Sequence, residues 1–212
     1  MIWWFIKPRN GASTLALQQN FGIGGYRSAW AILGKLRSCT VSPTRSALSG
    51  AVEVDQAFVG GVNNREIVLV AAEKRGSATG RIRLKHVPNQ TADEIQRFIK
   101  EVIELGSTIV SDRHKSYPSI VEKGYALRPQ KKPYYWEEVD GDDDRLLPRV
   151  GRATSLLKRW YYGTYQGRVE KANLQSYLDE FTFRFNRRTS GSRGLVFHRM
   201  VEAAVRSKPN PT

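Results

Sequence analysis

The chain has 212 residues, enough for one well-buried domain and a small additional segment. Its 34 lysines and arginines against 20 aspartates and glutamates give a net charge of +14, which favours a polyanionic partner such as nucleic acid. A single cysteine, Cys39, excludes a disulfide framework and a zinc site made of several thiolates.

The N-terminal region, residues 1–48, is basic and helical in pattern. Residues 1–50 contain six lysines and arginines and no acid. The apolar start is too short to span a bilayer and has no signal-peptide pattern, so we expect a cytoplasmic protein. Residues 13–37 predict two helices around a glycine-rich turn, which fits a DNA-binding helix-turn-helix and equally a plain helical hairpin. In the first interpretation Arg27, Lys35 and Arg37 contact DNA.

From Ala51 the pattern changes to that of strands. Residues 51–59, 66–72 and 80–87 predict three antiparallel strands with Gly and Asn turns between them. A helix from Thr91 to Glu104, a strand at 107–111, a helix around 117–123 and a strand near 125–127 follow. Three strands, helix, strand, helix, strand is the order of an α/β RNase H-like fold, a mixed sheet in which the first strand lies beside the fourth. We expect this domain to cover residues 51–206.

The C-terminal part combines a polar loop with basic helices. Residues 129–150 predict a solvated loop, and residues 154–160 and 174–185 predict helices whose aromatic positions suit a core. Residues 145–193 contain 11 basic and three acidic residues, which favours contact with DNA over a merely solvated face. The tail, residues 207–212, is Pro-rich.

Two aspartates occupy unusual places in the predicted strands. Asp55 lies inside one apolar strand and Asp112 ends another, and a carboxylate is costly in such a position unless a metal ion or an arginine stabilises it. If the strands are neighbours, both carboxylates can hold a divalent cation, for which Mg²⁺ is the natural candidate. In the alternative interpretation Asp55 is a paired structural acid and Asp112 begins a loop. The three histidines show no metal-ligand spacing.

Four segments resemble bacterial insertion-sequence transposases of the DDE type, from a family whose full-length members begin with a zinc ribbon. The first is LSGAVEVDQAFVGG (Leu48–Gly61), which looks like the family's first catalytic strand, and the second is IVSDRHKSY (Ile109–Tyr117), which looks like its second-aspartate motif. SLLKRWYYGTYQGRV (Ser155–Val169), followed by LQSYLDEFTFRFNRR (Leu174–Arg188), is similar to the family's C-terminal signature. Asn10–Arg37 resembles the helical segment that precedes the catalytic domain.

The resemblance implies roles for individual residues. Asp55 and Asp112 are implied to be catalytic ligands of Mg²⁺ or Mn²⁺, and Lys158 a catalytic residue that contacts DNA near them. Further DNA contacts are implied for Arg159, Trp160, Arg184, Arg187 and Arg188.

Two features depart from the family pattern. The zinc ribbon has no counterpart here, as expected of a natural short form or of a truncated reading frame. The third catalytic residue of the family, an Asn, His or Glu, falls seven positions before Lys158, where this chain has Gly151. A glycine has no side chain to bind a metal ion, and Asp142–Asp144 are the nearest acids that could replace it.

These observations leave three hypotheses. The first is a transposase that cleaves DNA at the ends of an insertion sequence and joins the freed 3′-hydroxyl to target DNA, possessing reduced activity because of Gly151. The second is a non-catalytic DNA-binding remnant of such a transposase. The third, a nuclease for RNA–DNA hybrids, is disfavoured by the C-terminal signature. The expected partners are double-stranded DNA, as element ends and target, and further copies of the chain on that DNA, at the nucleoid rather than at a membrane.

Overall fold

The chain forms two compact units in the computed structural model, which describes residues 1–212 except 9, 43–44, 62–64, 113–116, 131–146 and 207–212. We call residues Ser46–Lys158 the sheet unit, and Met1–Arg45 together with Arg159–Thr212 the helical unit. The sequence predicts one domain over residues 51–206, whereas in the structure the residues after Lys158 group with the N-terminal helices. No helix in the described part of the chain is long and apolar enough to cross a membrane.

The sheet unit is built on one five-stranded mixed sheet with the order β3-β2-β1-β4-β5. Its strands are β1 (Ala51–Val59), β2 (Glu66–Arg75), β3 (Ala78–Val87), β4 (Thr108–Ser111) and β5 (Ala126–Pro129). β1, β2 and β3 pair antiparallel, while β4 pairs parallel with both β1 and β5. The predicted RNase H-like order is confirmed, with the first strand beside the fourth.

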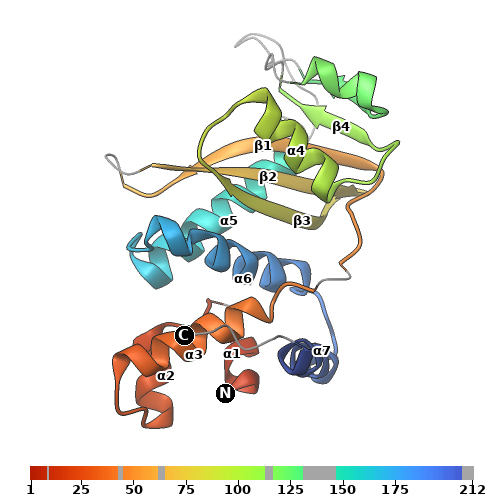
Figure 1. Ribbon diagram of the computed structural model, residues 1–212. Coiled ribbons are helices and arrows are strands. Elements are labelled where there is room, and N and C mark those ends of the chain that lie inside the picture. The colour runs from red at the N-terminus through yellow and green to blue at the C-terminus, as the bar shows by residue number, and fades with distance from the viewer. Residues whose placement is uncertain (9, 43–44, 62–64, 113–116, 131–146, 207–212) are drawn as a thin grey trace. The chain divides into compact units, whose positions relative to one another are not determined.

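One face of this sheet carries the hydrophobic core. Helix α4 (Ala92–Val102) lies over it (Figure 1), and begins at Thr91, whose side chain accepts a hydrogen bond from the Glu94 amide at 3.4 Å. Val52 and Val54 of β1 pack into the same core as Phe98 of α4. Because side chains alternate along a strand, Glu53 and Asp55, which each follow one of these valines, belong to the other face. The core therefore fixes which face of β1 carries its acids.

Helix α5 (Pro148–Tyr165) follows β5 and is longer than predicted. The predicted polar loop covered residues 129–150, but β5 extends to Pro129 and α5 begins at Pro148, a residue that suits a first helical turn. The acids Asp142–Asp144 lie outside the described residues. Between β4 and β5 the chain forms a 3₁₀ helix, η1 (Pro118–Lys123).

The helical unit contains the predicted pair of N-terminal helices. They are α2 (Thr14–Phe21) and α3 (Tyr26–Ser38), and α2 ends at Gly22, whose φ of 61° is the left-handed conformation that glycine favours. The unit also contains α1 (Ile2–Ile6), η2 (Lys171–Asn173), α6 (Leu174–Asn186) and α7 (Arg193–Arg206). The sequence did not predict α1 or α7.

Candidate active site

Asp55 lies in β1, and Asp112 directly follows the adjacent strand β4. The parallel pairing of β1 with β4 joins Ala51 to Thr108 and Glu53 to Val110. Asp55 lies two residues beyond that pair on β1 and Asp112 two residues beyond it past β4, and the two are close enough for the charge of Asp112 to act on Asp55. Ile109 of β4 belongs to the core on the α4 side, so Val110 is directed to the other face. Asp112, by the same alternation, shares that other face with Asp55. The fold thus brings the two predicted acids together at one end of the paired strands.

The electrostatics of Asp55 agree with this arrangement. Burial raises the pKa of its carboxyl, the negative charge of Asp112 raises it further, and a hydrogen bond from the Gln56 amide at 2.8 Å acts in the opposite direction. Tyr117 is near both acids. Its pKa is raised mainly by burial, and further by the negative charges of Asp112 and Asp55. Its hydroxyl donates to the Val54 carbonyl at 3.4 Å. Two partly desolvated carboxylates that repel each other form an arrangement that a divalent cation stabilises.

The donor set fits such a cation only in part. Carboxylate oxygens are the ligands that Mg²⁺ and Mn²⁺ prefer, and Mg²⁺ commonly binds through one or two carboxylates while retaining water. Within the described residues, however, no group of three His, Cys, Asp or Glu side chains is placed to hold a metal ion. Asp55 and Asp112 are thus two candidate donors, and water or a substrate phosphate could complete the coordination.

Position 151, where the family pattern has its third ligand, lies in the first turns of α5. A Cβ atom added to Gly151 would meet no atom within 4 Å, so the backbone leaves room for a side chain there. Lys158 follows seven residues later, which on an α-helix is the same face, roughly 10 Å along the axis. Its side chain is exposed.

A buried acid holds the start of α5 against β1. The carboxylate of Glu53 accepts hydrogen bonds from the Arg149 and Val150 amides at 2.7 and 3.0 Å, and from Arg149 Nη1 at 2.8 Å. Neither Glu53 nor Arg149 was among the site residues predicted from the sequence. A signal was present, because Glu53 is a second carboxylate in the same apolar strand, two residues from Asp55 and therefore on the same face.

Comparison with known proteins decides the family. Residues 47–186 match the model of the ISXO2-like transposase domain. The chain belongs to this transposase family. It is thus a DDE-type transposase, a class that acts on DNA with divalent metal ions, as its motifs imply.

Other comparisons give remote similarity. Among curated proteins, none matches the transposase. A chain of the simian T-cell lymphotropic virus intasome in complex with the PP2A regulatory subunit B56 gamma is 14% identical, with 94% of this chain and 77% of that one covered, at a TM-score of 0.45. The HTLV-2 integrase catalytic core domain in complex with magnesium, in its trimeric form, is 12% identical, with 71% and 94% covered, at a TM-score of 0.44.

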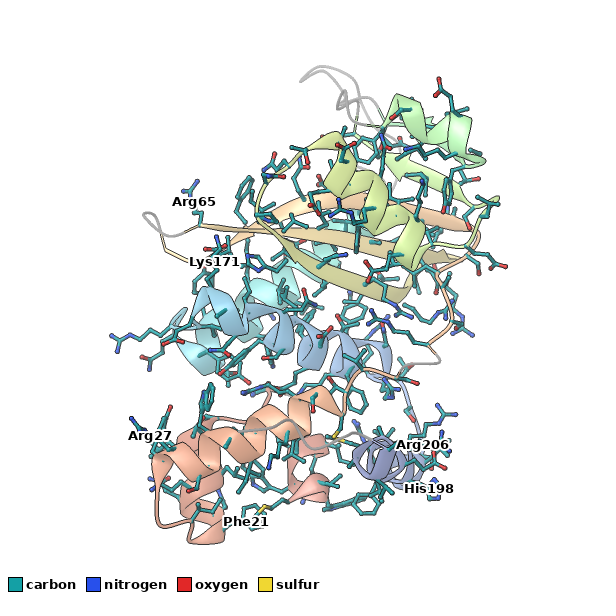
Figure 2. All side chains as sticks on the ribbon, viewed as in Figure 1. Phe21, Arg27, Arg65, Lys171, His198 and Arg206 are labelled. Atoms are coloured by element: carbon teal, nitrogen blue, oxygen red, sulfur yellow. The ribbon has the colours of Figure 1, made fainter. Side chains whose placement is uncertain are left out.

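The residues predicted to contact DNA divide by exposure. In the transposase structure Arg27, Lys35, Lys158, Arg159 and Arg188 are exposed. Figure 2 shows Arg27 directed outward near the start of α3. These five side chains can reach a phosphate without a change in the fold.

Arg187 is half-buried at the end of α6, with its guanidinium over the Phe183 ring at 4.1 Å. Burial and the nearby charge of Arg199 lower its pKa. Arg188 has a similar contact, over the Phe185 ring at 4.0 Å, and donates to the Phe185 carbonyl at 2.9 Å. Both arginines therefore help to complete the C-terminal end of α6.

Three of the predicted DNA contacts are instead packed inside the helical unit. Arg37 is 2% exposed and donates to Glu180 at 2.8 Å, and Arg184 donates to the same carboxylate at 2.8 Å. Trp160 is 7% exposed, with its ring centroid 4.8 Å from that of Tyr165. Arg37 and Trp160 are buried, and Arg184 is half-buried and bound to Glu180, so we do not include these three in the proposed DNA contacts. The residues around Arg37 in the sequence do not show that it is buried, because Glu180, the acid that pairs with both arginines, lies 143 residues away.

Proposed function

We propose that this transposase cleaves DNA at the ends of an insertion sequence and transfers the freed strand to target DNA, with Mg²⁺ or Mn²⁺ held by Asp55 and Asp112. The observation that supports the proposal most directly is that β1 and β4 are parallel neighbours, with the charge of Asp112 close enough to raise the pKa of Asp55. Two neighbouring carboxylates at an apolar strand reduce stability, because each is costly to desolvate and the two repel each other. Such a pair therefore indicates a functional site.

Each residue of the site has a role in this proposal. Asp55 and Asp112 bind the ions through their carboxylate oxygens. Such ions, when bound, activate the attacking oxygen and neutralise charge on the phosphate and the leaving oxygen. Lys158, exposed on the same face of α5 as position 151, contacts a DNA phosphate and fixes the strand relative to the carboxylates.

Gly151 limits the activity that we propose. A site with two carboxylates and no third protein ligand holds its ions less firmly, and a small misplacement in phosphoryl transfer reduces the rate by orders of magnitude. We therefore propose weak cleavage, stronger with Mn²⁺ than with Mg²⁺, because Mg²⁺ requires near-ideal octahedral geometry. The same glycine favours a second candidate function, a non-catalytic DNA-binding remnant that occupies element ends.

DNA binding in the proposal uses the exposed basic residues. Lys158 and Arg159 of α5 contact phosphates near the site. The acid-free pair α2–α3 binds the element's end as a separate segment, with Arg27 and Lys35 on its exposed side. Arg187 and Arg188 add positive charge at the end of α6. Copies of the chain assemble on the DNA so that two ends are held together.

A strand-transfer assay tests the proposal. The full chain is incubated with pre-nicked duplexes of the element's own ends and a plasmid target, in Mg²⁺ or Mn²⁺, at high concentration, so that chemistry rather than end recognition limits the rate. Weak transfer that is stronger in Mn²⁺ and is lost in Asp55→Asn and Asp112→Asn supports the enzyme. Binding without transfer in either metal supports the remnant. Strong Mg²⁺-dependent transfer contradicts the expected impairment, and Asp142–Asp144 are then the first substitute ligands to test.

A further inference from the structure

Glu53 is a nearly fully buried acid whose hydrogen bonds join two elements of the candidate active site. Its side chain is 5% exposed, and its carboxylate accepts from two successive amides at the start of α5 and from the Arg149 guanidinium. Arg149 also donates through Nη2 to the Gly76 carbonyl at 3.4 Å. A carboxylate at a helix N-terminus is favourable because the first amides of a helix have no partner within the helix.

The place of this contact in the sequence matters for the site. Glu53 precedes Asp55 by two residues on the same face of β1, and Val150 directly precedes Gly151. The contact therefore joins the strand that carries the first aspartate to the helical turn that carries position 151. The same helix carries Lys158, seven residues beyond position 151.

We propose that Glu53 is a positioning residue, which fixes α5 so that position 151 and Lys158 face Asp55 and Asp112. The inference rests on the proposed function of those two aspartates. Glu53 is not itself a metal ligand in this proposal, because its two oxygens already accept three hydrogen bonds, one of them from a cation. Its action on the site passes through the helix. Comparing single and double variants of Glu53 and Gly151 separates this indirect effect from direct binding of the metal ion by Glu53.

The first measurement tests the contact itself. Hydrogen exchange of the amides at 149 and 150 is compared between the full chain and Glu53→Gln, and we expect exchange to accelerate by about tenfold or more, because hydrogen bonds to a charged acceptor are lost or weakened. Glu73→Gln is the matched control, since Glu73 pairs with Arg81 in the same sheet unit and accepts from the Ser49 amide at 3.0 Å. It should leave exchange at 149 and 150 unchanged. Should Glu53→Gln fail to fold, Arg149→Met removes the ion pair and the hydrogen bond to the Gly76 carbonyl but keeps both amide contacts to Glu53, and should accelerate the same amides to a smaller extent.

The second measurement tests the positioning role. Mn²⁺ affinity is determined by titration for the full chain, Gly151→Glu, Glu53→Gln and the double variant. We expect Gly151→Glu to raise the affinity roughly tenfold when Glu53 is present, and by less than about twofold in the Glu53→Gln background, as for other residues that orient metal ligands. Glu53→Gln alone should change the affinity by less than about twofold.

Three results would overturn the inference. An equal loss of Mn²⁺ affinity on Glu53→Gln in both backgrounds would make Glu53 a ligand. Unchanged exchange at 149 and 150 would mean that the contact does not hold α5. A Gly151→Glu chain with no gain in affinity while Glu53 is intact would mean that the held helix does not direct position 151 to the metal ion. Failure of the proposed function is distinct, because Mn²⁺ affinity would then be insensitive to Asp55→Asn.

Discussion

Two acids of this chain, the buried Glu180 and the partly buried Asp55, have neighbours of opposite charge. Glu180, in the helical unit, is 0% exposed and pairs with Arg37 and Arg184, and the Tyr165 hydroxyl lies 3.5 Å from its Oε2. Asp55, in the sheet unit, faces a second carboxylate, that of Asp112. The first acid is neutralised within the protein, whereas the second has a neighbour of the same charge.

The difference separates a structural acid from a functional one. A buried carboxylate with a purely structural role is paired with cationic side chains of the protein, as Glu180 is with its two arginines. A pair of like charges is what a divalent cation from outside the protein can stabilise, and we propose that one does so here. On this reasoning, removal of Glu180 should damage the fold, and removal of Asp55 should damage only the chemistry.

Glu180→Ala should give the largest loss of stability. It leaves two guanidiniums buried without their carboxylate, which typically lowers the free energy of unfolding by about 3–5 kcal/mol. Urea denaturation, followed by circular dichroism, measures the change. The control is Glu202→Ala, an exposed acid on α7 whose loss should alter stability by no more than about 0.5 kcal/mol. If both variants are equally stable, Glu180 does not anchor the helical unit.

Gly151→Glu should raise DNA strand cleavage by roughly 10- to 100-fold, because it adds a third carboxylate at the position that the backbone leaves open. Gly151→Asn and Gly151→His should give smaller gains. Cleavage of labelled, pre-nicked end duplexes in Mg²⁺ measures the effect.

The control for this gain is Gly151→Ala, which removes glycine's flexibility from the start of α5 without adding a ligand. An equal gain from Ala would show that the defect lies in the helix and not in the metal site. Stability should change by less than about 1 kcal/mol in each variant, since a Cβ atom at 151 meets open space.

Much of the fold follows from local patterns. Alternation over residues 51–59 predicts β1 correctly, and helical periodicity after Thr91 predicts α4 to within two residues of its observed end. The limits of α5 could not be predicted, because its first turn is stabilised by Glu53, 96 residues before Arg149. The same reason applies to the grouping of the C-terminal helices with the N-terminal ones, since pairs such as Arg37–Glu180 join residues far apart in the chain.

The candidate site was predicted in part. Asp55 is conspicuous as an acid within an apolar strand and Asp112 as an acid directly after one, and their proximity follows once the strand order is known. Their metal-binding and catalytic roles remain predictions. The burial of Arg37, Arg184 and Trp160 could not be inferred, because a basic or aromatic residue at helical spacing suits an exposed face and a paired interior equally.

Lys158→Ala with Arg159→Ala should weaken DNA binding without changing which sequences are bound. Each phosphate contact contributes about 0.9 to the slope of log affinity against log salt concentration, so two contacts should flatten that slope by about 2. Fluorescence anisotropy on a labelled duplex between low and moderate salt measures it. Lys74→Ala with Arg75→Ala, exposed at the end of β2, removes the same charge elsewhere. An identical slope change in both double variants would mean that net charge, and not the surface around Lys158, controls binding.

Asp55→Asn should produce the smallest effect, a small change in the free energy of unfolding whose sign tests the comparison of the two acids. Burial and Asp112 raise the pKa of Asp55 above its ordinary value of 3.8 in the folded chain. A carboxyl with a raised folded pKa favours the folded state in acid, and that contribution is lost as the pH rises through the folded pKa. In metal-free buffer at pH 7 the ionised Asp55 therefore destabilises the fold, and its replacement by Asn should stabilise it by less than about 1 kcal/mol, since the Gln56 amide keeps an acceptor.

The gain should shrink as the pH falls through the raised folded pKa of Asp55, and should be smallest below its ordinary value of 3.8, where the carboxyl is mostly neutral in both states. Thermal unfolding in EDTA at pH 7 and at pH 3.5 measures the difference. Asp93→Asn is the control, because Asp93 lies exposed in the first turn of α4, where a negative charge is favourable, so its loss should be neutral or destabilising at pH 7. If Asp55→Asn destabilises the metal-free chain at pH 7, then Asp55 is held by the protein as Glu180 is, and the contrast between the two acids is wrong. Added Mn²⁺ should reverse the order, because the chain that retains Asp55 binds the ion and gains stability from it.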